Sequence, residues 1–325
     1  MQAIVIKQYG GPEVLVVEDR PTPQAEPGQV LIDVKAFGLN QAEVYFRSGA
    51  WGDVAEITGI ECVGVVRADP SQRLAPGQKV MAMVGGMGRS INGSYAEVVA
   101  VPHSNVVAIN SDLPWEELAA IPETYATAWS CLHGVLSLQK GQTVVVRGAS
   151  SALGQAAVNI AAHAGAHVLA TTRDTGRTPQ LQALGARHVL AHEAAMSNAV
   201  RALAPRGVDA VLDLVGNTTI LDSLAMLKRG GTACLAGFLG GGGPLTLEPV
   251  FQIPSGVGLS VFASALVLGN ADFPLSEIPF QTIVDRCAQG VYKAKPAKVF
   301  AFAQIQQAHR LLESGQAGGK IVVTT

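Results

Sequence analysis

Charged and aromatic residues are both scarce in this chain of 325 residues, and cysteine is rarer still. Charged residues make up 15% of the chain and aromatic residues 5%, whereas 48% are hydrophobic and the net charge is −2. A chain so close to neutrality has no basic stripe for a phosphate backbone, so we expect no nucleic-acid partner. The hydrophobic content excludes a disordered chain and predicts a compact soluble enzyme.

The few cysteines are far apart in the sequence, at Cys62, Cys131, Cys234 and Cys287. None belongs to a CxxC pair, and none has a histidine at ligand spacing, which indicates a reducing compartment. The sequence MQAIVIKQYGG turns polar by its seventh residue and shows no cleavage site, so we expect no signal peptide. These features together predict a cytoplasmic protein.

Residues 249–271 form an uncharged run that is longer than a membrane span requires. Pro254, Gly256, Gly258 and Asn270 interrupt any helix there, so we expect a buried strand and no membrane partner.

The first 120 residues consist of short alternating runs, such as AIVIKQY, QVLIDVKAFGL and ECVGVVRA, separated by turn residues. This pattern predicts small strands in a barrel-like or sandwich unit. From about residue 115 the pattern changes, and TVVVRGA, HVLATTR, VDAVLDLV and TACLAGF alternate with helical segments. The second pattern predicts a parallel sheet covered by helices on both faces.

A loop of small residues, Gly148 to Gly154, lies between the strand TVVVRGA and an alanine-rich helix. Small residues at this place in a βαβ unit let the phosphates of a dinucleotide approach the backbone at the positive end of the helix. The loop departs from GxGxxG at two positions, but its placement still predicts a cofactor site. The residues expected to bind there are Ala149, Ser150, Ala152, Leu153 and Gly154.

Nineteen residues after Gly154, at the end of the second strand, Arg173 follows Thr172 where NAD-preferring folds usually carry an acidic residue. A cation at this position suits the 2′-phosphate of NADPH, and Arg177 supplies a second one. Asp174 argues the other way, because its carboxylate could reach the ribose or repel the phosphate. The two arginines lead us to expect NADPH, contacted by Thr172, Arg173 and Arg177.

Several stretches, in a fixed order, carry a family resemblance: GLNQAEVYFRSG, GIECVGVV, GSYAEVVAVP, GQTVVVRGASSALG, GVDAVLDLVG and AHRLLESGQAGGKIVV. Over nearly its whole length the chain resembles the zinc-free quinone oxidoreductase branch of the medium-chain dehydrogenase/reductase superfamily. The resemblance implies an α/β protein whose Rossmann dinucleotide-binding domain is inserted in a GroES-like, mainly β catalytic domain. It implies a catalytic domain of residues 1–122 and 266–325, a Rossmann NADPH-binding domain of residues 123–265, and an active site in the cleft between domains.

The resemblance also indicates that no metal is needed. Zinc-dependent relatives use a cysteine where this chain has Asn40, and a Gly-His-Glu where it has Ile60 between Gly59 and Glu61. The cysteines of a structural zinc lobe are also missing from residues 85–100. Without a metal, alcohol oxidation loses its main source of alkoxide stabilisation, so reduction of an electrophilic acceptor is favoured.

The resemblance assigns the catalytic segment as well. It places Asn40 and Tyr45 beside the nicotinamide and the acceptor, where either could hydrogen-bond a carbonyl that gains negative charge. It places Trp51 at the substrate rim, where stacking on a planar acceptor and an ordinary lid role are both open. For Tyr45 a satisfied buried phenol is the alternative, and Glu43, which replaces a family aspartate, is expected to orient its neighbours.

Further cofactor contacts are implied for residues outside the glycine loop. Thr127, Gly237 and Phe238 are expected near the nicotinamide, and Gly216 elsewhere along the cofactor. His192 takes the place of a family tyrosine near the adenosine, and Lys320 is expected to approach the cofactor phosphates.

The sequence thus predicts an NADPH-dependent oxidoreductase that transfers a hydride to a small-molecule acceptor, a quinone or enone. A reductase of enoyl thioesters or other activated alkenes is the alternative. A thioester carrier would favour a basic patch, and the sequence shows no obvious one, although Arg47, Arg67, Arg73 and Arg89 could converge in space. A non-enzymatic nucleotide-binding protein is a third reading. We also expect a homodimer, because residues 258–264 suit a strand at the edge of the Rossmann sheet.

Overall fold

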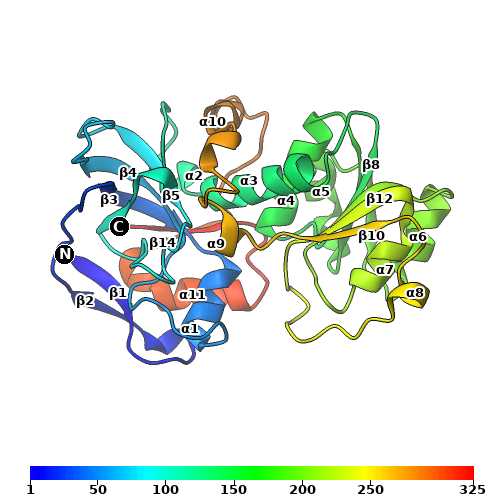
Figure 1. The fold of residues 1–325 in the computed structure, drawn as a ribbon, viewed down its shortest axis with the longest axis horizontal. Helices are drawn as coiled ribbons and strands as arrows, with labels where there is room; N and C mark the ends of the chain where they lie inside the picture. Colours follow the sequence, from blue (N-terminus) through cyan, green and yellow to red (C-terminus); the bar gives the residue numbers. More distant parts are fainter. The chain divides into compact units, whose positions relative to one another are not determined.

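The computed structural model describes residues 1–325, and the chain divides into two compact units (Figure 1). The first, here called the β unit, comprises Met1–Ala126 and Ser264–Thr325, and the second, the α/β unit, comprises Thr127–Ala263. The boundaries expected from the sequence, after residues 122 and 265, differ from these by four and two residues. The first difference arises because one helix, α3 (Pro122–Trp129), carries the chain through the boundary without a break.

The β unit is built on a seven-stranded sheet of order β14-β15-β3-β4-β5-β7, in which β6 also pairs with β3. All its pairings are antiparallel except β14 with β15. Its strands are β3 (Gln29–Gly38), β4 (Glu61–Ala68), β5 (Lys79–Met83), β6 (Val98–Pro102), β7 (Val106–Ala108), β14 (Lys298–Ala301) and β15 (Ile321–Thr324). A separate antiparallel pair consists of β1 (Gln2–Ile6) and β2 (Leu15–Asp19).

Helices lie among these strands in the sequence. They are α1 (Gln41–Ser48), α2 (Trp115–Leu118), α3, α9 (Ser264–Val267), α10 (Phe280–Ala288) and α11 (Ile305–Glu313). Short 3-10 turns occur at η1 (Pro12–Val14), η2 (His103–Asn105), η5 (Leu275–Glu277) and η6 (Phe302–Gln304). The helix α11 owes its place to an amphipathic pattern that buries Ile305 and Ala308 in the core of the β unit.

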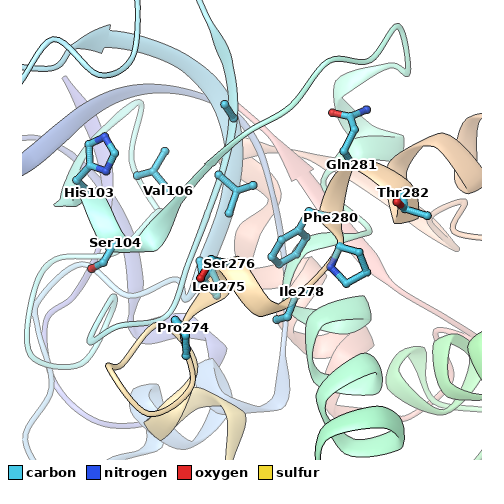
Figure 2. A pocket seen from close by; sticks show the side chains of 13 residues that line it. His103, Ser104, Val106, Pro274, Leu275, Ser276, Ile278, Phe280, Gln281 and Thr282 are labelled. Atoms are coloured by element: carbon cyan, nitrogen blue, oxygen red, sulfur yellow. The ribbon is translucent and has the colours of Figure 1, made fainter.

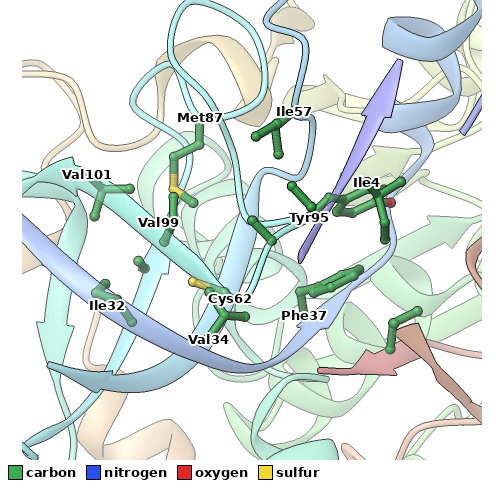
Figure 3. Close-up of a cluster of buried hydrophobic side chains, with 14 of the residues drawn as sticks. Ile4, Ile32, Val34, Phe37, Ile57, Cys62, Met87, Tyr95, Val99 and Val101 are labelled. Carbon is green, nitrogen blue, oxygen red and sulfur yellow. The ribbon is translucent and has the colours of Figure 1, made fainter. Parts of the chain in front are cut away.

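The core of the β unit gathers side chains from several of these strands (Figure 3). Phe37 of β3 stacks on Tyr95 with the ring centroids 4.6 Å apart, and Ile4 of β1 and Cys62 of β4 belong to the same cluster. The mixed origin of these side chains explains why β3 is buried over most of its length rather than on alternate residues. The carboxyl end of β3 leads directly into the segment that contains Asn40.

The α/β unit contains a six-stranded, wholly parallel sheet of order β10-β9-β8-β11-β12-β13. Its strands are β8 (Thr143–Arg147), β9 (His167–Thr172), β10 (His188–Ala191), β11 (Val208–Asp213), β12 (Leu227–Leu235) and β13 (Gly258–Val261). The helical segments are η3 (Ser130–Val135), α4 (Ala152–His163), η4 (Thr175–Arg177), α5 (Thr178–Ala183), α6 (Met196–Leu203), α7 (Ile220–Ala225) and α8 (Pro249–Gln252). This strand order is that of a doubly wound dinucleotide-binding sheet, in which the order of strand addition reverses between β8 and β11. Ligands bind such sheets at the carboxyl ends of the strands beside this switch point.

The uncharged segment of residues 249–271 differs from the expected buried strand. It contains α8, the four-residue strand β13 and α9. Val250 and Phe251 are 86% and 87% exposed and Val261 is 63% exposed, so the expectation of burial was wrong. The reason is that β13 is an edge strand with β12 as its one neighbour. No helix anywhere in the chain combines the length and the apolar character that crossing a membrane would require.

Candidate functional site

The glycine loop after β8 is fixed by Ser151 at the start of α4. Its hydroxyl accepts the Gly154 N–H at 3.1 Å and donates to the Gly148 carbonyl at 2.9 Å, so one side chain closes both ends of the loop. Gly148 has a φ of +82°, which favours glycine. A Cβ on Gly154 would lie 2.5 Å from the Gly148 carbonyl oxygen, so only glycine permits this close turn. The loop therefore keeps the compact shape of a phosphate-binding turn despite its altered motif.

The loop residues match the requirements of a dinucleotide diphosphate. Ala149 is fully buried, and its N–H is bonded to the Thr171 carbonyl at 3.0 Å, which anchors the loop on β9. Ala152 and Leu153 begin the twelve-residue helix α4, so their N–H groups belong to the first turn, where helical partners are missing. Because that end of a helix also carries positive dipole charge, the loop and α4 fit a bound diphosphate.

The end of β9 brings the two expected arginines and Asp174 together. The Asp174 carboxylate accepts the Gly176 N–H at 2.9 Å and the Arg177 Nε–H at 3.3 Å. Arg173 is exposed and forms no hydrogen bond or ion pair. The Asp174 carboxylate is thus hydrogen-bonded within its own turn, whereas the exposed Arg173 is a cation that a phosphate could contact.

Thr172 and His192 also meet at this end of the sheet. The buried Thr172 hydroxyl donates to the Asp174 carbonyl at 3.1 Å, and the Thr172 carbonyl accepts the His192 N–H at 2.8 Å. His192 is exposed and directly follows β10, so its ring lies at the surface of the same strand ends.

On the other side of the switch point, a fully buried carboxylate at the end of β11 organises the next loop. Asp213 accepts the N–H groups of Val215 at 2.8 Å and Gly216 at 3.0 Å, and the hydroxyls of Thr219 at 2.9 Å and Ser223 at 2.6 Å. No role was expected for Asp213 from the sequence. A carboxylate at the end of an apolar strand was the signal that could have found it.

Arg147, the last residue of β8, joins the same network from beneath the glycine loop. Its Nη1 donates to Asp222 at 2.7 Å, to the Thr219 carbonyl at 3.1 Å and to the Ser223 hydroxyl at 3.0 Å. Arg147 is fully buried, and no role was expected for it from the sequence. The network fixes the loops after β8 and β11 to α7.

The remaining cofactor candidates of the α/β unit lie in tightly packed backbone. A Cβ on Gly237 would lie 2.6 Å from the Leu214 carbonyl oxygen, and one on Gly216 would lie 3.0 Å from the Gly237 carbonyl oxygen. The loops after β11 and β12 therefore touch at these two glycines. Phe238 is half-buried next to them, and Thr127 is fully buried at the first position of the unit.

In the β unit, Asn40 is the residue just before α1, and its amide is held at both ends. Its Nδ2 donates to Glu61 Oε1 at 2.8 Å, and its Oδ1 accepts from Lys320 Nζ at 2.5 Å. Lys320 Nζ also lies 2.6 Å from Glu61 Oε1. Glu61 is fully buried and Lys320 is 5% exposed, so this is a buried ion pair that fixes the orientation of an amide.

The residues present here do not fit a zinc ion. The ammonium of Lys320 already contacts Glu61 and Asn40, and Ile60 offers no ligand atom. A Cβ on Gly38 would lie 2.4 Å from both Glu61 Oε1 and Lys320 Cε, which shows how closely the backbone encloses the pair. Nowhere in the chain do three histidine, cysteine, aspartate or glutamate side chains gather as metal ligands would. A cation is therefore present at this site as part of the protein.

Glu43, in the first turn of α1, is a fully buried carboxyl next to this ion pair. It accepts the Asn40 N–H at 2.8 Å and the Ile60 N–H at 3.1 Å, which ties the two segments together. Burial raises the pKa of Glu43 to about 7, while the Ile60 hydrogen bond and the Lys320 charge oppose the shift. The carboxyl orients Asn40 and Ile60, and it titrates near neutral pH.

This titration predicts a pH-dependent stability. The folded pKa of Glu43, about 7, exceeds the ordinary value of 4.5. The protonated side chain therefore makes its full contribution to the free energy of unfolding below pH 4.5, and this contribution is lost as the pH rises through about 7. Glu43→Gln keeps an acceptor oxygen but does not titrate. Its free energy of unfolding relative to wild type should therefore rise by about 3 kcal/mol between about pH 4 and about pH 8, measured by urea unfolding.

The control for this pH prediction is the exposed Glu26, whose substitution Glu26→Gln should leave the pH profile of stability unchanged. Parallel profiles for wild type and Glu43→Gln would show that Glu43 is charged throughout the range.

Tyr45 and Trp51 form an aromatic pair at the other end of α1. Their rings stack with centroids 5.2 Å apart, and Phe46 meets Trp51 edge to face at 5.6 Å. Both Tyr45 and Trp51 are half-buried. Burial raises the pKa of the Tyr45 phenol, and a hydrogen bond with Gln41 opposes that shift. The pair presents a flat, partly exposed aromatic surface.

A cavity of about 600 Å³ lies elsewhere in the β unit, between the segment at β7 and the segment from η5 to α10 (Figure 2). His103 and Ser104 line one side, and Leu275, Phe280 and Gln281 line the other. None of its lining residues is a predicted site residue, and most of the lining is apolar. The candidate residues therefore lie outside this cavity, in one set around Asn40 in the β unit and in a second set at the strand ends of the α/β unit.

Comparison with known proteins gives consistent relatives. The family described as alcohol dehydrogenase GroES-like domain matches residues 26–111, and the family described as zinc-binding dehydrogenase matches residues 152–275. A quinone oxidoreductase of Lama guanicoe is 27% identical over 99% of this chain and 97% of its own length. A mycobacterial structure complexed with NADPH is 28% identical, with a TM-score of 0.87 and complete coverage of both chains. The enoyl reductase CurK is 26% identical, with a TM-score of 0.81, and the match covers 99% of this chain and 98% of CurK.

The matches agree with the two units. The GroES-like match lies wholly in the β unit, and most of the second match lies in the α/β unit with its doubly wound strand order. The expected fold, a Rossmann domain inserted in a GroES-like domain, is confirmed. The two family matches and the quinone oxidoreductases among the relatives support placing this chain in the quinone oxidoreductase branch of the medium-chain dehydrogenase/reductase superfamily.

Proposed function

We propose that this protein is an NADPH-dependent oxidoreductase that transfers a hydride, without a metal, to a quinone or related conjugated carbonyl compound. One observation carries the proposal: Asn40, at the position of a zinc ligand in relatives, is held by the buried pair of Lys320 and Glu61. An amide donor next to a fixed cation suits a carbonyl that gains electrons. It does not suit an alcohol that must first lose a proton.

For the cofactor, we propose that the glycine loop and the first turn of α4 hold the diphosphate. Arg173, assisted by Arg177, would bind the 2′-phosphate through charge-assisted hydrogen bonds, and His192 would lie against the adenosine. Thr127, Gly237 and Phe238 would border the nicotinamide, which supplies the hydride when the cofactor is bound. The NADPH in the similar mycobacterial structure supports this choice of cofactor.

For the acceptor, we propose that Asn40 donates to the carbonyl oxygen. Its Nδ2 carries two hydrogens, and one of them is used by Glu61. Lys320 on the Oδ1 polarises the amide and makes the second N–H a stronger donor as negative charge develops. The stacked rings of Tyr45 and Trp51 would receive the flat face of a quinone. Lys320 is engaged in this arrangement, so its expected role at the cofactor phosphates stays a prediction.

Quinone and enone acceptors are favoured over enoyl thioesters on carriers. Two of the four arginines that could form a basic patch are occupied, because buried Arg47 pairs with Glu313 and Arg67 pairs with Asp33 at 2.6 Å. The test is an NADPH-oxidation screen over quinones, enones, enoyl thioesters and aldehydes. Fastest turnover with quinones or enones is expected. Turnover with enoyl thioesters alone would make the chain the alternative reductase, and no turnover with tight NADPH binding would make it a binding protein.

The proposal predicts activity without metal. The purified protein should contain well under one zinc per chain by elemental analysis, because Lys320 and Ile60 exclude the ion from the Asn40 site. Incubation with a chelator should leave the rate of NADPH oxidation unchanged. One tightly bound zinc per chain, together with loss of activity on chelation and recovery with added zinc, would contradict this part of the proposal.

A cytoplasmic location is part of the same proposal. All four cysteines are free thiols, and Cys62, Cys131 and Cys234 are buried. Burial also raises the pKa of the Cys287 thiol to about 12, so it carries little reactive thiolate. A chain whose cysteines form no disulfide suits a reducing compartment.

We further propose a homodimer formed through the edge of the α/β sheet. The backbone of β13 has a free side, Val261 on this strand is exposed, and so are Val250 and Phe251 of α8, which precedes β13 in the sequence. A two-fold contact between copies would cover these groups and close at two subunits. Light scattering at micromolar concentration should give about twice the chain mass of 33.6 kDa.

Val261→Lys should shift the dimer to monomer, because it would bury a charge at the edge. Its control is Val299→Lys on β14, the edge strand of the other sheet, where Val299 is 40% exposed. A wild-type monomer, or equal effects of the two variants, would contradict the proposed interface.

A further inference from the structure

Glu61 connects the Asn40 site to a second set of groups through its other carboxylate oxygen. Whereas Oε1 binds Asn40 and Lys320, Oε2 accepts the Glu123 N–H at 2.7 Å. Glu61 is fully buried, so both contacts are shielded from water. The carboxylate that orients the Asn40 amide is therefore bonded directly to the first turn of α3.

Glu123 in turn binds the segment at which the chain re-enters the β unit. Its Oε1 accepts the Ser264 hydroxyl at 2.7 Å, and Glu123 is 8% exposed. The chain leaves the β unit within α3, after Ala126, and Ser264 at the start of α9 is the first residue after its return (Figure 1). Glu123 thus ties together the two places where the chain crosses between the units, and Glu61 ties both to Asn40.

We propose that Glu123 is a positioning residue that couples these two crossing points to the Asn40 amide through Glu61. The inference rests on the proposed function, because it assigns the coupling to the acceptor site of that reaction. A displacement of either connection when the cofactor binds the α/β unit would pass through Ser264 and Glu123 to Glu61. Glu61 can then hold Asn40 in its donating orientation only when the connections are in place.

The contacts that link Ser264 to Asn40 lie among buried or partly buried residues. The bonds at Glu61 Oε2 and at Ser264 are both 2.7 Å long. Water readily replaces a hydroxyl that is lost at the surface, but Glu123 is only 8% exposed, so water has less access to replace the Ser264 hydroxyl. Ser264 is therefore the residue whose substitution tests the coupling most specifically, because it lies outside the proposed acceptor and cofactor sites.

The experiment compares Ser264→Ala, Ser264→Thr and the matched control Ser71→Ala. Ser71 makes the same kind of bond in the β unit, from its hydroxyl to Asp69 at 2.6 Å, but joins only local residues. We expect Ser264→Ala to lower kcat about tenfold while the Kd for NADPH, measured by fluorescence titration, stays within about twofold. Ser264→Thr, which keeps the hydroxyl, should restore kcat, and Ser71→Ala should change neither value.

A second readout needs no acceptor. Hydrogen exchange of residues 38–48 should slow when NADPH binds the wild type and Ser264→Thr, and should stay unchanged in Ser264→Ala. Absence of any difference between Ser264→Ala and wild type in this exchange would overturn the coupling. A kcat loss shared equally by Ser71→Ala would overturn it too. Failure of the wild type to reduce any acceptor would refute the proposed function, while the exchange experiment would still decide the coupling.

Discussion

Replacing Lys320 with methionine should lower the free energy of unfolding by about 3–5 kcal/mol and nearly abolish activity. The substitution leaves fully buried Glu61 without its cationic partner, at 2.6 Å in the native protein. It also removes the donor to Asn40 Oδ1 and frees the amide to rotate. Urea unfolding measures the first effect, and kcat for quinone reduction measures the second.

Two further variants separate the buried pair from ordinary surface charge. Lys320→Met combined with Glu61→Gln removes the unpaired charge and should recover most of the lost stability, but not the activity. Lys7→Met breaks the exposed pair with Glu18, of the same 2.6 Å length, and should cost under about 1 kcal/mol. Equal losses for Lys320→Met and Lys7→Met, or no recovery in the double variant, would contradict the account of the site.

The double variant also tests the sequence-based expectation that Lys320 reaches the cofactor phosphates. If its ammonium serves only Asn40 and Glu61, the double variant should bind NADPH as tightly as wild type. A large rise in the Kd for NADPH would instead place part of the role of Lys320 at the phosphates.

Arg173→Ala should lower kcat/KM for NADPH about thirtyfold and leave kcat/KM for NADH nearly unchanged. The Arg173 guanidinium is exposed and has no partner in the protein, so its removal should change the free energy of unfolding little. The 2′-phosphate of NADPH would lose one charge-assisted hydrogen bond, which is worth about 2 kcal/mol. Steady-state kinetics with both cofactors measure the change.

Arg206→Ala is the control for cofactor preference, because Arg206 is another exposed arginine of the α/β unit, distant in sequence from the β9 turn. It should change neither value. An unchanged NADPH preference in Arg173→Ala would remove Arg173 from the cofactor site, and a wild-type preference for NADH would show that Asp174 prevails over the arginines.

The features predicted from the sequence are those that local patterns encode. The hydrophobic runs from TVVVRGA to TACLAGF specify strands alternating with helices, and their parallel sheet has the expected kind of topology. The loop after β8 could be placed because strand, small residues and helix are contiguous in the sequence. The burial of the uncharged run 249–271 was predicted wrongly, since Val250, Phe251 and Val261 are exposed. The edge position expected for residues 258–264 agrees with the place of β13 at the end of the sheet.

The features that the sequence did not reveal depend on contacts between distant segments. Lys320 meets Glu61 and Asn40 only because β15 pairs with β3, and nothing local to Lys320 indicates that partner. The bond between Glu123 and Ser264 likewise joins two segments separated by the whole α/β unit. Buried polar networks of this kind can be identified only from the tertiary structure. In each contact, at least one residue lies in no periodic pattern or motif that would indicate its partner.

The most direct test of the central claim is the rate of NADPH oxidation by the purified, chelator-treated protein with a small quinone, compared between wild type and Asn40→Ala. The account predicts quinone-dependent oxidation in the wild type that falls by about a hundredfold in Asn40→Ala, because the amide donor acts where negative charge develops. It also predicts that the Kd for NADPH is unchanged between the two proteins. Quinone-dependent oxidation that needs added zinc, or that is equally fast in Asn40→Ala, would contradict it.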